Sequence, residues 1–170
     1  MVLVGGHANA FTFRAQNRSI DFPAATQASS WLFDGYYWRK LGDMSVSRDG
    51  PACGQIDLPN GQTGVLAAGG CRQKCDPQRP RPLRSAEILD LESGSWRKVA
   101  DLPLRLMKAH IETFDGFPTI IGGRSERAEG NLDLYQFKNE RWVKHPRTRL
   151  NSPMQAGTIF EIPHKMFNYC

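Results

Sequence analysis

The sequence lacks the features that would mark a membrane protein or a secreted precursor. No apolar run in its 170 residues approaches the roughly 18 residues that a membrane-spanning helix needs. The start, Met1 followed by Val-Leu-Val-Gly-Gly, has no basic leader and no small-residue cleavage site. The missing leader favours a cytoplasmic location. The first residues look like the interior of a domain, so the N-terminus looks truncated and an extracellular location stays possible.

The sequence also lacks the short motifs that mark common catalytic sites. It has no Gly-x-Ser-x-Gly elbow, no phosphate-binding loop and no His-Glu-x-x-His zinc motif. Its four histidines and four tyrosines form no recognisable metal-binding constellation. We therefore expect a protein that is not an enzyme and that has neither a metal nor a cofactor.

Cysteine is scarce, and its pattern leaves two states open. The four residues are Cys53, Cys71, Cys75 and Cys170. An even count allows two disulfides in a secreted protein and equally allows four free thiols in a cytosolic one. Cys71 and Cys75 have no second ligand pair or nearby histidine at zinc spacing, so we expect no structural zinc site.

What the sequence does contain is a repeat. Three short apolar runs, rich in β-branched residues, each end in two glycines, as expected for buried strands that stop where unusual backbone angles are needed. The pairs are Gly5 and Gly6, Gly69 and Gly70, and Gly122 and Gly123. The dipeptides Asn60-Gly61 and Asp115-Gly116 add two hairpin turns, each before a glycine-terminated strand.

A tryptophan follows each glycine pair after a polar loop. The three tryptophans are Trp38, Trp96 and Trp142, and a large apolar residue stands seven positions before each: Trp31, Leu89 and Tyr135. Intervals of 58 and 46 residues separate the tryptophans. Three glycine pairs in register with three tryptophans make a specific signal, whereas a single pair or a single tryptophan would carry no information.

This order of strand, double glycine, large apolar residue and tryptophan resembles the Kelch repeat, whose period is about 50 residues. The resemblance covers nearly the whole chain, in segments of about 1–44, 45–102 and 103–170. It implies an all-β fold, a Kelch-type β-propeller of four-stranded antiparallel blades, with about three blades present of an expected six. The glycines, tryptophans, Leu89 and Tyr135 would then be structural.

The resemblance places the glycine pair at the end of the second strand of a blade and the tryptophan in the fourth. With strands a to d numbered from the axis outward, the chain reads b-c-d, a-b-c-d, a-b-c-d, a. The last strand, 154–163, would complete the first blade. Since propellers typically have four to eight blades, we expect a fragment of a larger propeller, with a genuine C-terminus, or two copies that close a six-bladed ring. The fragment is favoured.

The charge of the chain is predicted to concentrate on one face. In a propeller the b–c and d–a loops emerge on the same side. The three b–c loops carry formal charges of +1, +4 and 0, and the three d–a loops carry −1, +1 and +2. The sum for this face, +7, exceeds the +5 of the whole chain. The candidate partner-binding residues are Arg72, Lys74, Arg79, Arg81, Arg84, Arg124 and Arg127.

Arginines on loops of a rigid scaffold suit the recognition of carboxylates. We therefore expect a protein–protein interaction module that binds a partner protein or an acidic peptide. By family analogy it would serve as a ubiquitin-ligase substrate adaptor, although these 170 residues themselves contain no BTB or BACK domain. A set of merely solvated charges is the plainer alternative. Few aromatics accompany the arginines, so we expect no specific nucleic-acid binding.

Two further functions stay open at this level. Four cysteines and the Asn17-Arg18-Ser19 sequon would suit an extracellular adhesion or matrix module that is stabilised by disulfides. A fragment of a copper enzyme similar to galactose oxidase is the other alternative, because some Kelch-type propellers are enzymes.

Overall fold

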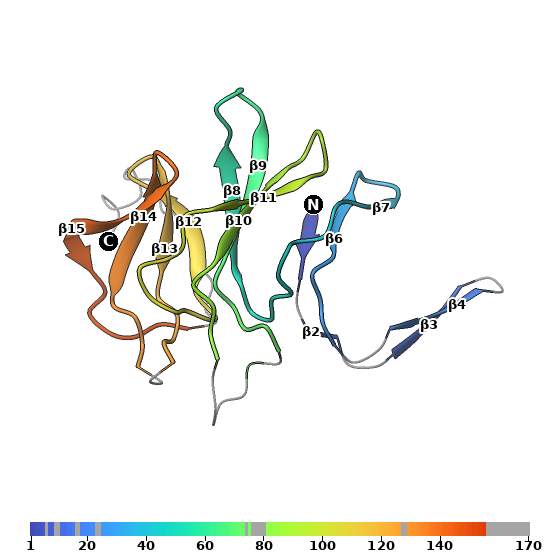
Figure 1. Ribbon diagram of the computed structural model, residues 1–170, viewed down its shortest axis with the longest axis horizontal. Helices are drawn as coiled ribbons and strands as arrows, with labels where there is room; N and C mark the ends of the chain where they lie inside the picture. The colour runs from blue at the N-terminus through green and yellow to red at the C-terminus, as the bar shows by residue number, and fades with distance from the viewer. Residues whose placement is uncertain are drawn as a thin grey trace, which may run out of the picture.

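The computed structural model describes residues 1–5, 7–8, 11–15, 18–22, 25–73, 75, 81–126 and 129–155, and from 7 to 25 it describes the backbone alone. The described residues form an all-β molecule whose main sheets stand side by side like segments of a fan (Figure 1). In this part of the chain no helix has the length and apolar character needed to cross a membrane.

Three antiparallel sheets are the blades of a partial propeller, which confirms the predicted fold. Blade 1 has three strands in the order β1(Val2–Val4)-β6(Ser30–Phe33)-β7(Trp38–Lys40). Blade 2 has four, β8(Ala52–Asp57)-β9(Thr63–Ala68)-β10(Ala86–Asp90)-β11(Trp96–Val99). Blade 3 has four, β12(His110–Phe114)-β13(Phe117–Ile121)-β14(Asp133–Lys138)-β15(Arg141–Arg149). The strands therefore follow the predicted order b-c-d, a-b-c-d, a-b-c-d, while the final strand expected at 154–163 lies almost wholly outside the described residues.

The segment between β1 and β6 differs from the plain loop that was expected. It contains two small antiparallel pairs, β2(His7–Ala8) with β5(Ala25–Thr26) and β3(Phe11–Ala15) with β4(Arg18–Phe22). In Figure 1 the second pair stands away from the three blades. Phe11 and Phe13 alternate with the polar Thr12 and Arg14, which fits the strand period of two and was a signal present in the sequence.

The glycine pairs are needed where the chain passes close to its own backbone. Gly69 and Gly122 both have positive φ, +66° and +68°, and a Cβ on either would overlap a carbonyl oxygen, that of Leu106 or of Met154. Gly70 N–H donates to Leu106 O at 2.8 Å and Gly123 N–H donates to Met154 O at 2.7 Å. The chain that leaves one blade is thus hydrogen-bonded under the b strand of that blade, and only glycine fits there.

One of the two predicted a–b turns, Asp115-Gly116, has the expected two-residue geometry, whereas the turn that contains Asn60-Gly61 is five residues long, between the paired Asp57 and Thr63. Asp115 and Gly116 both have positive φ, +50° and +74°, as a two-residue hairpin turn with the right-handed twist requires. Gly61 has φ +79° in the turn that joins β8 to β9.

The c–d hairpins differ in register although the sequence spacing is constant. Trp96 pairs with Leu89, seven residues earlier, whereas Trp38 pairs with Phe33 and Trp142 with Phe137, five residues earlier. The turn of blade 2 is therefore longer. Leu89 is buried as expected, while Tyr135 is half-buried and pairs with Lys144.

The hydrophobic core lies in blades 2 and 3 and between them. Its twelve buried members are Ala52, Leu58, Leu66, Ala68, Ala86, Ile88, Leu102, Leu106, Ala109, Ile111, Ile120 and Phe137. Gly54 lets β8 approach β12, because a Cβ on it would overlap the side chain of Ile111. No residue of blade 1 belongs to this core.

Candidate partner-binding face

The b–c and d–a loops lie together on one face, at the lower edge of Figure 1. Isolated antiparallel bridges join them into a ladder that crosses from blade to blade. The bridges are Asp49–Cys71, Cys71–Pro82, Leu83–Leu106, Met107–Arg124 and Arg124–Gly130. This loop ladder is fixed by backbone hydrogen bonds, so side chains on it are held in place before any partner arrives.

A disulfide ties the beginning of the blade 2 loop. Cys71 and Cys75 are bonded, with their Cα atoms 5.5 Å apart, so this pair is neither a zinc site nor two free thiols. Both half-cystines are attached to Asp49. Cys71 exchanges two 2.8 Å backbone hydrogen bonds with it, and Cys75 N–H donates to Asp49 Oδ2 at 2.8 Å. The basic loop after Cys75 therefore starts from a rigid point.

Three of the predicted arginines are exposed on this face. Arg72 and Arg81 are exposed, and their guanidinium groups have no partner among the described residues. Arg84 is also exposed, but its Nε donates to Leu102 O at 2.8 Å and holds the loop onto the next one. Arg72 and Arg81 are thus available for a ligand, while Arg84 also has a structural contact.

The other four predicted residues divide differently. Arg124 is half-buried and pairs through its backbone with Met107 and Gly130, so it belongs to the ladder more than to the exposed surface. Lys74, Arg79 and Arg127 lie outside the described residues. The sequence list omitted Arg105, an exposed d–a loop residue whose Nη1 donates to Pro82 O at 3.1 Å and whose Nε lies 3.5 Å from Glu126 Oε2.

Arg48 is a basic loop residue that the structure assigns to the interior. Its side chain is completely buried and lies 2.9 Å from Glu87 Oε1. It also donates to Gly69 O at 2.9 Å and to Ser85 O at 2.8 Å, while Ser45 N–H donates to the second oxygen of Glu87 at 2.7 Å. One arginine therefore attaches the loop after blade 1 to blade 2. Its sequence neighbours, Ser47 and Asp49, gave no apolar signal for burial.

The tryptophans repeat one contact between neighbouring blades. Trp96 Nε1 donates to Gly42 O at 3.0 Å, and Trp142 Nε1 donates to Ala100 O at 3.0 Å. In both cases the acceptor is the residue four positions after the tryptophan of the preceding blade. Trp38, which has no preceding blade, is 44% exposed.

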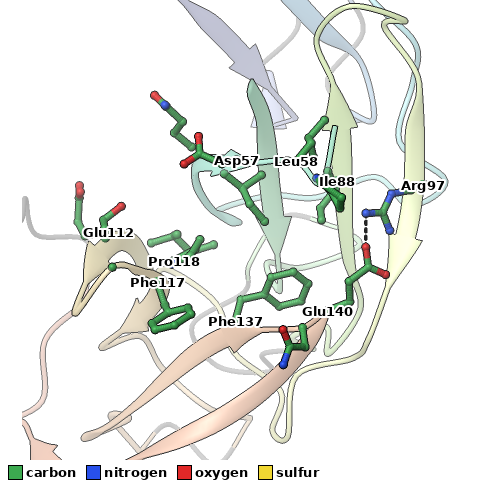
Figure 2. A pocket seen from close by; sticks show the side chains of 16 residues that line it. Asp57, Leu58, Ile88, Arg97, Glu112, Phe117, Pro118, Phe137 and Glu140 are labelled. Carbon is green, nitrogen blue, oxygen red and sulfur yellow. Dashed lines mark hydrogen bonds and ion pairs between the residues drawn. The ribbon is translucent and has the colours of Figure 1, made fainter. Parts of the chain in front are cut away.

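A pocket of about 600 Å³ lies between blades 2 and 3 at the opposite end, among the a–b and c–d turns (Figure 2). Leu58, Ile88 and Phe137 line its apolar part, and the Arg97–Glu140 ion pair closes one side (Figure 2). Sequence reasoning did not foresee this pocket, since its lining comes from six strands and from the turns between them. Among the described residues, no group of three or more His, Cys, Asp or Glu is placed to hold a metal ion.

Cys53 faces a second cleft of about 510 Å³ between blades 1 and 2, beside β1. Its side chain is exposed and carries no disulfide. The surrounding protein, which displaces water from the thiol, raises the pKa of Cys53 to about 12, and the charge of Arg48 opposes this only in part. With this raised pKa the thiol stays protonated at neutral pH and is a poor nucleophile.

Comparisons with known proteins agree with this geometry. Residues 62–103 match the Kelch motif. The chain is 27% identical over 125 residues to the F-box/kelch-repeat protein At1g67480 of Arabidopsis thaliana, an alignment that covers 71% of this chain and 31% of that protein. The solved structure of YjhT superposes with a TM-score of 0.57 at 11% identity, over 73% of this chain and 46% of that one.

The chain thus spans about a third of the curated relative and about half of the matched structure. The Kelch match falls on the glycine pair and tryptophan of blade 2, and the structural match, over 73% of this chain, extends the likeness in fold beyond that motif. The chain is a partial β-propeller that carries a Kelch motif in blade 2 and is similar to Kelch-repeat proteins.

Proposed function

We propose that this chain is a protein-interaction module whose loop ladder binds an acidic peptide or an acidic surface of a partner protein, and that it acts by binding rather than by catalysis. The observation that carries the proposal is the pair Arg72 and Arg81, exposed and without partners among the described residues, on a loop fixed by the Cys71–Cys75 disulfide. Kelch repeats generally serve protein binding, which supports the coarse assignment.

The chemistry of the face favours carboxylates. A guanidinium offers donors in a planar fork that matches a carboxylate, and it keeps its charge at every physiological pH. Because the loop backbones are already hydrogen-bonded to each other, little conformational entropy is lost when a ligand binds. Of the acidic residues in the described loops, Asp49 binds Cys75 and Glu126 binds Arg105, whereas Asp101 and Glu129 are exposed.

The test is binding of a fluorescein-labelled peptide rich in Asp and Glu, followed by anisotropy. The double variant Arg72→Gln/Arg81→Gln should weaken binding by at least tenfold, because each charge-assisted contact contributes about 1.5–3 kcal/mol. The matched control is Lys98→Gln/Arg141→Gln, which removes the same charge from exposed positions on β11 and β15. A control peptide with Asn and Gln in place of the acids should not bind.

Equal loss of binding in both double variants would reduce the effect to net charge and refute a specific site. Unchanged binding in the Arg72/Arg81 variant would refute the loop ladder as the binding face. Arg84 is left intact in this design because its hydrogen bond to Leu102 would confuse folding with binding.

A narrower role, substrate adaptor of a ubiquitin ligase, is part of the proposal. Its support is the name of the Arabidopsis relative, which joins Kelch repeats to an F-box. The check is whether the full-length protein co-purifies with ligase subunits from its source, and whether a partner bound through Arg72 and Arg81 accumulates when those residues are replaced.

The disulfide favours a second candidate, an extracellular adhesion or matrix module, because disulfides persist mainly in oxidising compartments. Thiol titration of the unreduced protein from its native source separates the two. Free thiols at Cys71 and Cys75 in that material would exclude the extracellular candidate. A disulfide between them would exclude a location in the reducing cytosol.

We further propose that two copies associate to complete a six-bladed ring. The support is the exposed large apolar surface at the two outer faces of the fan, which includes Trp38 on blade 1 and Val143 on blade 3.

A further inference from the structure

We infer that the outer face of blade 3 in one copy packs on the outer face of blade 1 in another, in the same register that joins blades within the chain. The inference rests on the proposed association of two copies and specifies its contact: Trp38 Nε1 donates to the carbonyl oxygen of Pro146, and Tyr36 packs on Val143. The occupant of the open face is thus a second copy of this chain.

The register follows from the two internal interfaces. Each tryptophan donates to the residue four positions after the preceding tryptophan, Trp96 to Gly42 and Trp142 to Ala100. The same step from Trp142 gives Pro146 on β15. Trp38 is the only tryptophan of the repeat in the described chain without such an acceptor. It is 44% exposed, a large fraction for a residue that is half-buried in the other two blades.

A second pair of equivalent positions, one on each open face, carries side chains that could pack together. Between blades 2 and 3, Arg97, one residue after its tryptophan, forms an ion pair with Glu140, two residues before the next tryptophan. The same two positions at the open faces are Val143 and Tyr36, and both are exposed, by 50% and 85%. A charged pair inside the chain is thus replaced by an apolar pair at the two ends.

Strand alternation puts Val143 on the correct side. Trp142 packs toward blade 2, and successive side chains of a strand point to opposite faces, so Val143 points away from blade 2. On blade 1, Tyr36 N–H and Tyr37 N–H both donate to Asp34 Oδ1 at 2.8 Å, which fixes the turn that carries the tyrosines. The corresponding turn of blade 2 contains Gly94 and Ser95, and that of blade 3 contains Glu140 and Arg141. Two exposed tyrosines on this turn therefore have no counterpart in the blades that are already packed.

The inner edge of blade 1 has no pairing strand within the part of the chain that the structure describes. β1 pairs with β6 on one side, and among the described residues no strand pairs with its other side, where blades 2 and 3 have β8 and β12. An unpaired inner strand beside exposed aromatics is a surface that a neighbouring chain would cover. The contact between blade 3 of one copy and blade 1 of the other would be made twice in a pair of chains. If each blade is rotated by a sixth of a turn from the previous one, six blades complete the circle and the pair closes instead of growing into a filament.

The experiment combines mass and cross-linking. The purified 170-residue chain should form a species of twice 19.1 kDa in size-exclusion chromatography with light scattering. In a background without Cys53 and Cys170, the pair Tyr36→Cys and Val143→Cys, placed on separate copies, should form an intermolecular disulfide under mild oxidation. The control pair Asn60→Cys and Val143→Cys should not, because Asn60 lies on the exposed a–b turn of blade 2.

Two further variants keep the inference falsifiable. Tyr36→Asp should weaken association by at least tenfold while the monomer stays folded, and Trp38→Phe, which removes the indole N–H and part of the ring while keeping an aromatic side chain, should weaken it about two- to tenfold. A chain that is monomeric at all concentrations, or a dimer that cross-links equally through position 60, would overturn the inference. The Tyr36→Asp monomer should still bind the acidic peptide, since the loop ladder lies at the other end of the blades. Loss of the dimer and loss of peptide binding are therefore separate results.

Discussion

The two interfaces between neighbouring blades are built from different chemistry. Blades 2 and 3 share a continuous apolar core in which Leu66, Ile88 and Ile120 are almost completely inaccessible. Blade 1 contributes nothing to that core. It is attached to blade 2 by the buried Arg48–Glu87 pair and by the hydrogen bonds of Trp96 to Ser30 and Gly42.

This difference teaches how one repeat can be joined in two ways. An apolar interface gains free energy in proportion to the area removed from water and tolerates small shifts. A buried ion pair contributes little net free energy to folding, but the loss of one partner leaves a buried charge without compensation and lowers the stability strongly. The blade 1–2 junction should therefore depend on few residues, and the blade 2–3 junction on many.

The largest expected effect is that of Arg48→Met. It leaves the carboxylate of Glu87 buried without its cation and should lower the free energy of unfolding by about 3–5 kcal/mol. Urea unfolding measures the loss, and hydrogen exchange should place it in blade 1 and in β10. The double variant Arg48→Met/Glu87→Leu should recover much of it, and the exposed control Arg105→Met should cost under about 1 kcal/mol. An effect of Arg48→Met no larger than that of Arg105→Met would remove the distinction between the two junctions.

The next effect is that of Ile120→Ala in β13. Removing this fully buried side chain leaves a cavity and should cost about 2–5 kcal/mol. Hydrogen exchange should show the loss in blades 2 and 3 together, with blade 1 affected less. If β1, β6 and β7 lose protection as fully as β12 and β13, the blades unfold as one unit and the comparison fails.

A smaller effect is expected for the indole hydrogen bonds. Trp142→Phe keeps most of the packing, removes the bond to Ala100 and should cost about 0.5–1.5 kcal/mol. Trp96→Phe should cost at least as much, because its N–H serves both Ser30 and Gly42. The matched change Trp38→Phe, measured at a dilution where the chain is monomeric, should be close to neutral. An equal cost at Trp38 would mean that its indole already has a partner within the chain.

The smallest effect concerns reactivity rather than stability. With a pKa of about 12, Cys53 stays protonated at pH 8, so iodoacetamide should modify it far more slowly than it modifies a thiol in the urea-unfolded chain. The rate should rise about tenfold per pH unit until the pH approaches the pKa. Peptide mass spectrometry at several pH values measures this. A rate at pH 8 equal to that of the unfolded chain would show that the cleft between blades 1 and 2 is fully hydrated.

The sequence allowed the blade order to be predicted because the repeat is local. The second strand of each blade is followed by a glycine pair, which a close backbone approach requires. The last strand of each blade has a tryptophan at or next to its start. The pairing within the c–d hairpins was not predictable from that spacing, since turn length sets the register: Leu89 and Tyr135 stand at the same distance from their tryptophans and pair differently. The hairpins between β1 and β6 were missed because their alternation was interpreted as loop.

The candidate site was only partly accessible from sequence. Counting charge by loop pointed to one face, where Arg72 and Arg81 are exposed, and the binding of a partner to that face stays a prediction. The count could not separate these arginines from Arg48, which pairs with a residue 39 positions away, or from Arg84, whose partner is a backbone oxygen. The state of Cys71 and Cys75 was open for the same reason, because their bond depends on the turn that Asp49 holds.

The sequence by itself determined the repeat, the order of the strands in the blades and the fold class, since these follow from backbone preferences and from apolar patterning within about 50 residues. Only the tertiary structure decided which arginine is buried, which tryptophan lacks an acceptor and where the core ends. Those outcomes depend on contacts between residues far apart in the chain, and such contacts are set by how blades pack on one another rather than by any local pattern.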